Sequence, residues 1–387
     1  MPKSLQLLAA LALLAPMAVG AQSAEPADSA PVASHEQTAQ RVGADETITS
    51  TLGHDSPSTT IDRPGAWYVK VHVTGLHLQP GDVLTVASPD GSETHTYSAD
   101  VTGNPAASPD ATGFWALSIT GQTAVVSLRG PDGAAAPASR ATVDRITRGF
   151  TPQEFAATTP IQPYSICGRN DYKDAVCYQS SNPTEFGKTP PVARLLMNGG
   201  SLCTGWRVGA SNRVLTNNHC IGNASTAANT EVWFNYQCTT CGGSTNAPVT
   251  KVLGSTLLKT NAALDYTLFD VKDFGKISSF GYLELDTTLP AVGDEMYIIG
   301  HPSAKPKKVS LADDQSTGGI CKVTAVKVQG DSAQSDIAYK CDTEGGSSGS
   351  PVLSRKTQKV IGLHHWGGCP NQGVRIDLIA AQIGSLL

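Results

Sequence analysis

Three separate stretches of the chain carry side chains that together could hydrolyse an amide bond. A histidine, His219, ends a strand-like run that begins at Val214; an acid, Asp265, enters an apolar run; and Ser348 lies in a glycine-rich stretch. A serine hydroxyl becomes an effective nucleophile when an imidazole accepts its proton, and a carboxylate holds that imidazole in the required tautomer. We therefore predict that Ser348 is the nucleophile, His219 the general base and Asp265 the acid that orients it.

The glycines around the serine have a separate chemical reason. Attack on an amide carbonyl generates an oxyanion, which converging backbone N–H groups stabilise. Side chains would obstruct the tight turn that this needs, and glycine removes them. We predict that the amides of Gly346 and Ser348 form the oxyanion hole. Asp270 is the local rival for the acid, but it ends the apolar strand that Asp265 enters.

Composition and motifs argue against several other functions. The formal net charge is −5, so the chain has no general attraction to nucleic-acid phosphates. The pair His364-His365 could ligate a metal, yet the sequence contains no His-Glu-x-x-His motif and no second ligand cluster. We expect no metal, no cofactor and no nucleic-acid partner.

The elements that position these residues should be mostly short strands. Only 16% of the 387 residues are charged, while 38 are glycine and 24 are proline, which is a turn-rich composition. In residues 46–148, short alternating apolar runs are separated by turn signals such as Pro89-Asp90-Gly91. This pattern predicts a small antiparallel β-sandwich.

The remaining parts of the chain differ in composition. Residues 1–21 have a lysine, an apolar run and then small residues, which is typical of a cleaved secretory signal. Residues 22–45 lack a hydrophobic period, so we expect them to be disordered. We interpret residues 149–160 as a linker and residues 161–387 as the domain that carries the chemistry. The mature protein should be secreted, without a membrane anchor.

Cysteine placement supports this division. All nine cysteines lie between Cys167 and Cys369. In an oxidising compartment this predicts a disulfide-stapled C-terminal domain and an N-terminal one without disulfides.

The motifs resemble those of chymotrypsin-fold serine peptidases, in the bacterial branch that includes glutamyl and lysyl endopeptidases. The resemblance covers about residues 161–387 and rests on Thr216–Cys220, Leu264–Leu268 and Gly346–Pro351, in the family's order of His, Asp and Ser. It implies an all-β fold: two six-stranded antiparallel β-barrels with the triad in the cleft between them, and a C-terminal helix. The apolar residues of the chain's end, from Ile376 to Leu387, have helical spacing.

The resemblance also implies disulfides. A Cys203–Cys220 bridge would hold the loop of His219 near its barrel, and similarity to lysyl endopeptidase suggests Cys177–Cys241 and Cys167–Cys369. A hairpin interpretation adds Cys321–Cys341. Because nine is odd, one thiol is left over. We assign the free thiol to Cys238, although Cys238 could instead pair with Cys177 and leave Cys241 free.

Substrate preference is less defined. Asp342 precedes Ser348 by the spacing that, in trypsin-like relatives, places a carboxylate at the floor of the substrate pocket, which favours cleavage after Arg or Lys. In glutamyl endopeptidases a histidine lines the pocket instead, and His364 and His365 are candidates for that alternative. The aspartate that lysyl relatives carry after Cys369 is missing here.

The strand around His365, Trp366 and Gly367 is expected to bind the substrate backbone as an added strand. The partners of the protein would be protein or peptide substrates, and we expect the protein to be a monomer.

The N-terminal sandwich has two functional interpretations. It is either a pro-region that is removed on activation, for which Arg148 offers a self-cleavage position, or a retained accessory module. A second functional class is an inactive secreted binding protein on a peptidase scaffold. Against that class, no triad residue and no oxyanion glycine is missing.

Overall fold

The computed structural model describes residue 1 and residues 39–98, 113–158 and 165–387. The expected secretory signal and most of the segment expected to be disordered lie outside the described residues. Within the described part of the chain, no helix is both long and apolar enough to cross a bilayer.

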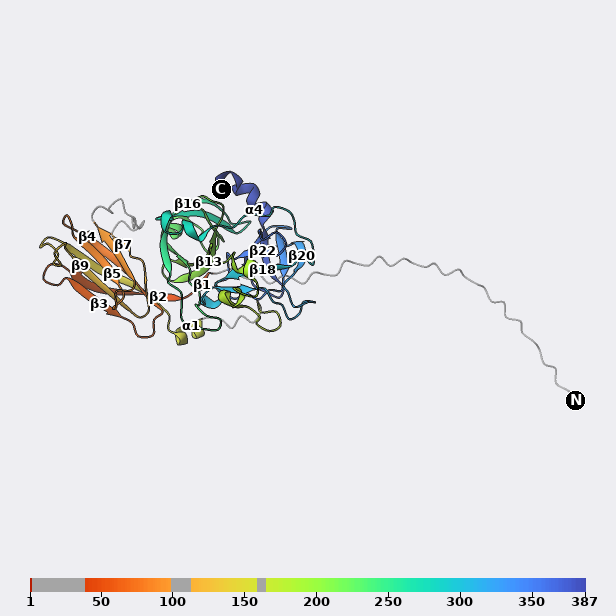
Figure 1. Cartoon of the computed structure of the whole chain (residues 1–387), viewed down its shortest axis with the longest axis horizontal. Helices are drawn as coiled ribbons and strands as arrows, with labels where there is room; N and C mark the ends of the chain where they lie inside the picture. The colour runs from red at the N-terminus through yellow and green to blue at the C-terminus, as the bar shows by residue number, and fades with distance from the viewer. Residues whose placement is uncertain (2–38, 99–112, 159–164) are drawn as a thin grey trace. The chain divides into compact units, whose positions relative to one another are not determined.

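An N-terminal β-sandwich is built from two antiparallel sheets (Figure 1). Its strands are β2 (Gly43–Leu52), β3 (Ser58–Asp62), β4 (Tyr68–His77), β5 (Val83–Ala87), β6 (Thr94–Ser98), β7 (Gly113–Trp115), β8 (Ile119–Thr120), β9 (Thr123–Arg129) and β10 (Arg140–Gly149). One sheet has the order β2-β10-β4-β7 with β8 beside β4, and the other β3-β9-β5-β6. A single hydrophobic cluster with side chains from both sheets, including Val71 and Val126, forms the sandwich core.

The first barrel follows the sandwich in the chain. Its strands are β12 (Val192–Met197), β13 (Ser201–Arg207), β14 (Val214–Thr216), β15 (Thr230–Phe234), β16 (Thr250–Asn261) and β17 (Tyr266–Val271). They pair in the order β13-β12-β15-β16-β17-β14, and β14 pairs back with β13. The six strands therefore close into a barrel, as the sequence predicted.

The second barrel is less completely closed. Its strands are β11 (Lys173–Asp174), β18 (Met296–Gly300), β19 (Lys308–Ser310), β20 (Val323–Val328), β21 (Asp336–Tyr339), β22 (Pro351–Ser354), β23 (Val360–Trp366) and β24 (Asn371–Arg375). They form one sheet in the order β11-β19-β18-β22-β23-β24-β21-β20. Two backbone bonds, Met296 N–H to Cys321 O and Val323 N–H to Asp294 O, bring the β18 and β20 ends together. Six strands thus curve into a partly closed barrel with two more appended.

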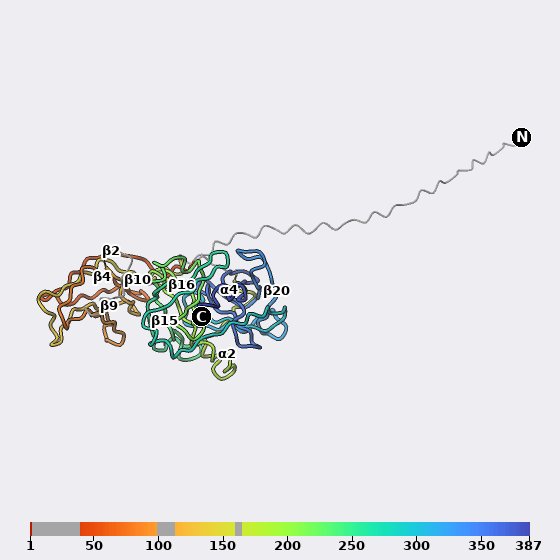
Figure 2. Tube along the Cα trace, turned by 90° about the horizontal axis from the view of Figure 1, so that it is seen from above, coloured from red at the N-terminus to blue at the C-terminus, as the bar shows by residue number. Residues whose placement is uncertain are grey.

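The described residues also contain four short α-helices: α1 (Pro152–Thr158), α2 (Pro183–Phe186), α3 (Ala224–Ala228) and α4 (Ile376–Ile383). The predicted C-terminal helix is α4, and it buries Ile376, Ile379 and Ile383 in a cluster that also contains Leu215 of the first barrel and Ile299 of the second. The two barrels therefore share one core, which fixes the walls of any cleft between them. Figure 2 shows α4 and the C-terminus among the barrel strands, and the sandwich strands β2, β4, β9 and β10 grouped together.

Two segments that connect the predicted domains contain regular structure among their described residues. The segment expected to be disordered, 22–45, contains β1 (Gln40–Arg41), which pairs with β13, and the start of β2. The expected linker, 149–160, contains helix α1. The order of β1 depends on a partner that is distant in sequence. Gln40 pairs with Leu202, and local composition carries no trace of that contact.

Candidate active site

His219 and Asp265 form a close pair at the rim of the first barrel. His219 Nδ1 lies 2.7 Å from Asp265 Oδ2, and the His219 backbone N–H donates to Oδ1 at 2.9 Å. Asn217 donates from its side chain to the Asp265 carbonyl at 2.8 Å. These bonds fix the carboxylate relative to the imidazole, which is the arrangement that holds a general base in one tautomer.

A second histidine shares the same carboxylate. His365 Nδ1 lies 3.3 Å from Asp265 Oδ2, and His365 Nε2 lies 2.6 Å from Asp336 Oδ2. Although burial opposes ionisation, hydrogen bonds from His219 and His365 lower the pKa of Asp265 to about 2. Burial also opposes the charged form of His365, but Asp265 and Asp336 raise its pKa to about 9. At neutral pH Asp265 is therefore a carboxylate and His365 an imidazolium.

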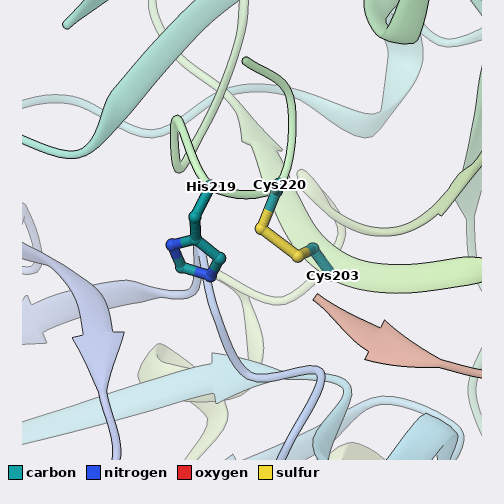
Figure 3. Close-up of side chains that lie close together, drawn as sticks. All are labelled: Cys203, His219 and Cys220. Carbon is teal, nitrogen blue, oxygen red and sulfur yellow. A yellow bond between two sulfur atoms is a disulfide. The ribbon is translucent and has the colours of Figure 1, made fainter. Parts of the chain in front are cut away.

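Ser348 is attached to the same strand as the histidine loop. The Thr204 N–H donates to the Ser348 carbonyl at 2.8 Å, and Thr204 Oγ1 donates to the Gly346 carbonyl at 2.9 Å. The neighbouring residue, Cys203, forms a disulfide with Cys220, next to His219. Figure 3 shows the His219 ring beside this disulfide. Consecutive residues of β13 thus anchor the serine loop and the histidine loop.

The loop before Ser348 contains a position that only glycine fits. Gly346 has φ +94°, and a Cβ there would lie 2.7 Å from the His301 carbonyl, so this position demands glycine. The Gly345 carbonyl accepts from the Ser303 N–H at 2.6 Å. Because a trans peptide directs its C=O and N–H to opposite sides, the Gly346 N–H points away from Ser303. The amides of Gly346 and Ser348 donate to no described residue.

The far side of the imidazole carries no protein bond. His219 Nε2 is buried and has no hydrogen-bond partner among the described residues, so it is not bonded to the half-buried Ser348. Catalytic hydrogen bonds are often long without substrate and shorten in the substrate complex. The ring therefore keeps one acceptor position available for a proton.

Two groups of three side chains in the described part of the chain lie close enough to share a metal ion. The first contains His219 with Cys203 and Cys220, but these two sulfurs are bonded to each other and so offer no thiolate (Figure 3). The second contains Asp265, Asp331 and His365. Since Asp265 and His365 already belong to the network of His219, we assign this group to that network.

Asp342 lies apart from the histidines. It is 3% exposed, and its two oxygens accept backbone N–H groups from Cys167 at 2.9 Å and Asp171 at 2.6 Å. Burial raises the pKa of Asp342 to about 6, although the hydrogen bonds from these two amides lower it. No ion pair to Asp342 is present among the described residues.

The other predicted binding residues lie on β23 or directly after it. His364 is buried, and its Nδ1 lies 2.8 Å from the Tyr339 hydroxyl; burial lowers its pKa to about 3, so it is neutral. The ring of Trp366 stacks on the ring of His365 with 5.2 Å between the ring centroids, and Gly367 directly follows β23. The two adjacent histidines therefore have different partners, and His365 rather than His364 contacts Asp265 of the His219–Asp265 pair.

The disulfides of the structure are the four pairs expected. They are Cys167–Cys369, Cys177–Cys241, Cys203–Cys220 and Cys321–Cys341, and Cys238 is free and buried.

Sequence reasoning missed Thr204 and Asp336. Thr204 lies in a plain strand, and its contribution depends on a contact with Ser348, far along the chain. Asp336 begins β21 and becomes notable only when the fold brings His365 to it. No local signal marks either residue.

The family model of the lysyl endopeptidase C-terminal domain matches residues 171–374, more than half of the 387 residues. The chain belongs to the lysyl endopeptidase family. The predicted resemblance to chymotrypsin-fold serine peptidases is thereby confirmed, and the lysyl endopeptidase domain coincides with the two barrels.

Individual relatives also match parts of the lysyl endopeptidase-like chain. The secreted RxLR effector protein 73 of Plasmopara viticola is 35% identical over 217 residues, which are 54% of this chain and 52% of the relative. A glutamyl endopeptidase of Staphylococcus aureus is 40% identical over 81 residues, 21% of this chain and 19% of the relative. This chain thus spans about half or less of the length of these curated relatives.

Solved structures are similar at lower identity. A glutamyl endopeptidase structure is 19% identical and has a TM-score of 0.41, covering 58% of this chain and 100% of that one. A serine endoprotease from Yersinia pestis is 14% identical with a TM-score of 0.40, covering 54% of this chain and 66% of that one.

Proposed function

We propose that the protein is a secreted serine endopeptidase that cleaves peptide bonds through an acyl-enzyme. The observation that carries this proposal is the His219–Asp265 pair, whose remaining ring nitrogen is buried without a partner among the described residues. Thr204 and the Cys203–Cys220 bridge tie the Ser348 loop and the His219 loop to one strand. The free ring nitrogen of His219 can therefore accept the proton of the Ser348 hydroxyl.

In the proposed reaction, Ser348 Oγ attacks the scissile carbonyl while His219 Nε2 takes the hydroxyl proton. The carbonyl oxygen becomes an oxyanion and accepts hydrogen bonds from the Gly346 and Ser348 amides. The imidazolium of His219 then protonates the leaving amine, and the C–N bond breaks to leave the acyl-serine. Water, deprotonated by His219, hydrolyses this ester and restores the hydroxyl.

Asp265 stabilises the imidazolium that forms at His219 in each half of this cycle. Its low pKa, about 2, keeps it ionised across the physiological range, so it does not compete for the proton. The bonds between His365 and both Asp265 and Asp336 hold the carboxylate in place.

For side-chain preference we propose cleavage after Arg or Lys. The supporting observation is that Asp342 is a buried carboxylate with neutral amide donors and no cationic partner among the described residues. A substrate guanidinium or ammonium would supply the missing charge. The glutamate alternative needs a histidine to bind an acid, and both His364 and His365 are already engaged with protein groups.

Secretion is part of the proposal. Four disulfides in one domain are typical of proteins that fold in an oxidising compartment, and residues 1–21 have the composition of a signal peptide. We propose that the N-terminal sandwich belongs to the precursor.

The test is digestion of an unstructured protein, casein, with the new termini read by mass spectrometry. Ser348→Ala should lose about four or more powers of ten in rate while remaining folded. The matched control is Ser350→Ala, which removes a buried hydroxyl of the same stretch that has no partner among the described residues. If Ser348→Ala cleaves casein as fast as Ser350→Ala, the proposal is wrong. An inactive scaffold would give no new termini from any variant.

A further inference from the structure

Strand β1 lies on the edge of β13 that leads to the catalytic loops. Gln40 pairs with Leu202 and Arg41 with Ser201, antiparallel, on the side of β13 that farther along pairs with β14. Figure 1 shows β1 beside β13 among the barrel strands, and in Figure 3 the faint red strand near Cys203 belongs to the same N-terminal segment. A segment from before the sandwich has therefore been added to the barrel as an extra strand.

The backbone bonding at this edge follows from the register. The Val42 N–H donates to the Gly200 carbonyl at 2.8 Å. In an antiparallel ladder, hydrogen-bonded pairs alternate with non-bonded ones, so the next bonded pair after Val42–Gly200 is Gln40–Leu202. Gln40 thus uses the N–H and C=O of Leu202, which any other peptide would need in order to bind at this edge.

This pairing position is directly beside the proposed chemistry. Leu202 precedes Cys203, whose disulfide partner Cys220 follows His219. Ala39 packs against the hydrophobic cluster that contains both of these cysteines. A Cβ placed on Gly345 would lie 2.1 Å from Gln40 Oε1, so the Gln40 side chain also contacts the residue before the oxyanion amide of Gly346.

The direction of β1 is that of the leaving half of a substrate. The amine released from the scissile bond must lie beside the base that protonates it. The substrate residues that follow this amine therefore extend away from the base in the N-to-C direction. In β1 the end nearest the Cys203–Cys220 bridge is the N-terminal one, because Gln40 faces Leu202 and Arg41 faces the more distant Ser201. Extended peptides bind proteins by adding a strand to such an edge.

We propose that Ala39–Arg41 occupies the part of the cleft that binds the leaving half of a peptide substrate, so that the intact chain inhibits itself toward extended substrates. This inference rests on the proposed peptidase function. The sandwich is then an inhibitory pro-region, which resolves the two interpretations that the sequence left open.

The sandwich holds this segment in place. Val42 is fully buried, its carbonyl accepts from the Phe150 N–H at 2.8 Å, and Gly43 pairs with Gly149 at the start of β2. The Tyr68 hydroxyl of the sandwich donates to the carbonyl of Gly199, next to β13. Because β1 continues directly into β2, the sandwich tethers the segment beside β13.

Three full-length proteins test the inference: the natural chain, Gln40→Pro and Gln40→Ala. Proline removes the N–H that Gln40 donates to Leu202, whereas alanine keeps it and serves as the matched control. Each is treated with a fluorophosphonate, a small probe that needs the nucleophile and base but no residues on the leaving side. Each is also given casein, with mass spectrometry verifying that the chain is intact.

We expect similar fluorophosphonate labelling of all three proteins. Casein cleavage should be faster by about tenfold or more for Gln40→Pro alone, since a tethered strand competes with the substrate at a high effective concentration. Equal casein rates in three labelled proteins would overturn the inference and leave the peptidase function standing. No labelling of any would overturn the function, and the inference with it. If proline prevents folding, seen as loss of labelling in that variant alone, Gln40→Gly with Arg41→Gly weakens the strand, and an unchanged casein rate there contradicts the proposal.

Discussion

Two buried carboxylates of this chain are similar in acidity and opposite in surroundings. Burial raises the pKa of both Asp265 and Glu231, yet their partners bring each to about 2. Asp265 is held by the imidazoles of His219 and His365 in the candidate active site. Glu231 of β15 lies where the sandwich meets the first barrel, paired with Lys70 of β4.

The two networks differ in whether a hydrogen-bonding atom is left without a partner. Glu231 Oε1 accepts from Lys70 Nζ and the Ser118 N–H, and Oε2 accepts from Ser118 Oγ and Trp233 Nε1. Both oxygens are therefore saturated. The Asp265 network instead ends at His219 Nε2, which has no partner among the described residues. A saturated network stabilises a structure, whereas one with an unused ring nitrogen can still accept a proton.

The largest expected effect is on the chemistry. Asp265→Asn removes the charge that stabilises the His219 imidazolium, and we expect the rate of casein cleavage to fall about ten-thousand-fold. Initial rates at equal concentrations of folded protein, checked by circular dichroism, measure this. A loss smaller than about tenfold would show that the pair does not serve as we describe.

Glu231→Gln should instead act on stability. It leaves Lys70 uncompensated in a fully buried position, and breaking such a pair typically costs about 3–5 kcal/mol. Urea unfolding in a Ser348→Ala background, which prevents autolysis, measures the free energy of unfolding. The matched control is Glu284→Gln, whose carboxylate is 58% exposed and lies 3.5 Å from Lys359, and it should cost less than about 1 kcal/mol. Equal costs at the two positions would remove the distinction between them.

Asp342 extends the comparison to a third buried carboxylate, one without a cation among the described residues. Asp342→Asn keeps the size of the side chain and removes the charge that we propose meets Arg or Lys of the substrate. Cleavage after basic residues, counted from casein termini, should fall about a hundredfold relative to other sites, as for the loss of a charge-assisted contact. Unchanged termini would mean that Asp342 serves only to hold the amides of Cys167 and Asp171.

A smaller effect is expected on the pH dependence of stability. The pKa of His365 is raised to about 9 in the folded chain, above the ordinary value of 6.5. Its contribution to stability is therefore complete below about pH 6.5 and is lost as pH rises through about 9. Asp265, Asp331 and Asp336 face this ring, and the neutral His364 adjoins it.

We expect the free energy of unfolding of Ser348→Ala to fall by about 1–3 kcal/mol between pH 6.5 and 9.5. The same protein with His365→Gln should show a flatter profile over this range. A parallel profile in both proteins would contradict the assignment of the charge to His365.

Much of the fold and part of the site could be predicted from the sequence. Residue types and order identified His219, Asp265 and Ser348, and the structure brings the first two to hydrogen-bond distance. Their catalytic roles stay a prediction. Alternating apolar runs and turn residues predicted the sandwich strands because these signals are local, whereas the two barrels were implied by the resemblance of the motifs.

The rest depends on contacts between residues that are far apart in sequence. Asp336 looks like any acid at the start of a strand until β23 carries His365 to it. Gln40 lies in a stretch without hydrophobic period. It forms a strand because it pairs with Leu202, and the whole sandwich lies between these two residues in the sequence. Lys70 interrupts an apolar strand and would be assigned to a solvent face, but Glu231 pairs with it in the interior. Partner identity, which only the fold supplies, decides each of these cases.

The most direct test of the central claim is the labelling of Ser348 by a fluorophosphonate, located by peptide mapping and compared between the natural chain and His219→Ala. We expect a single modification on Ser348 in the natural chain and labelling slower by about a thousandfold or more without the imidazole. Labelling at another serine, or at the same rate in both proteins, would contradict the proposed nucleophile and base.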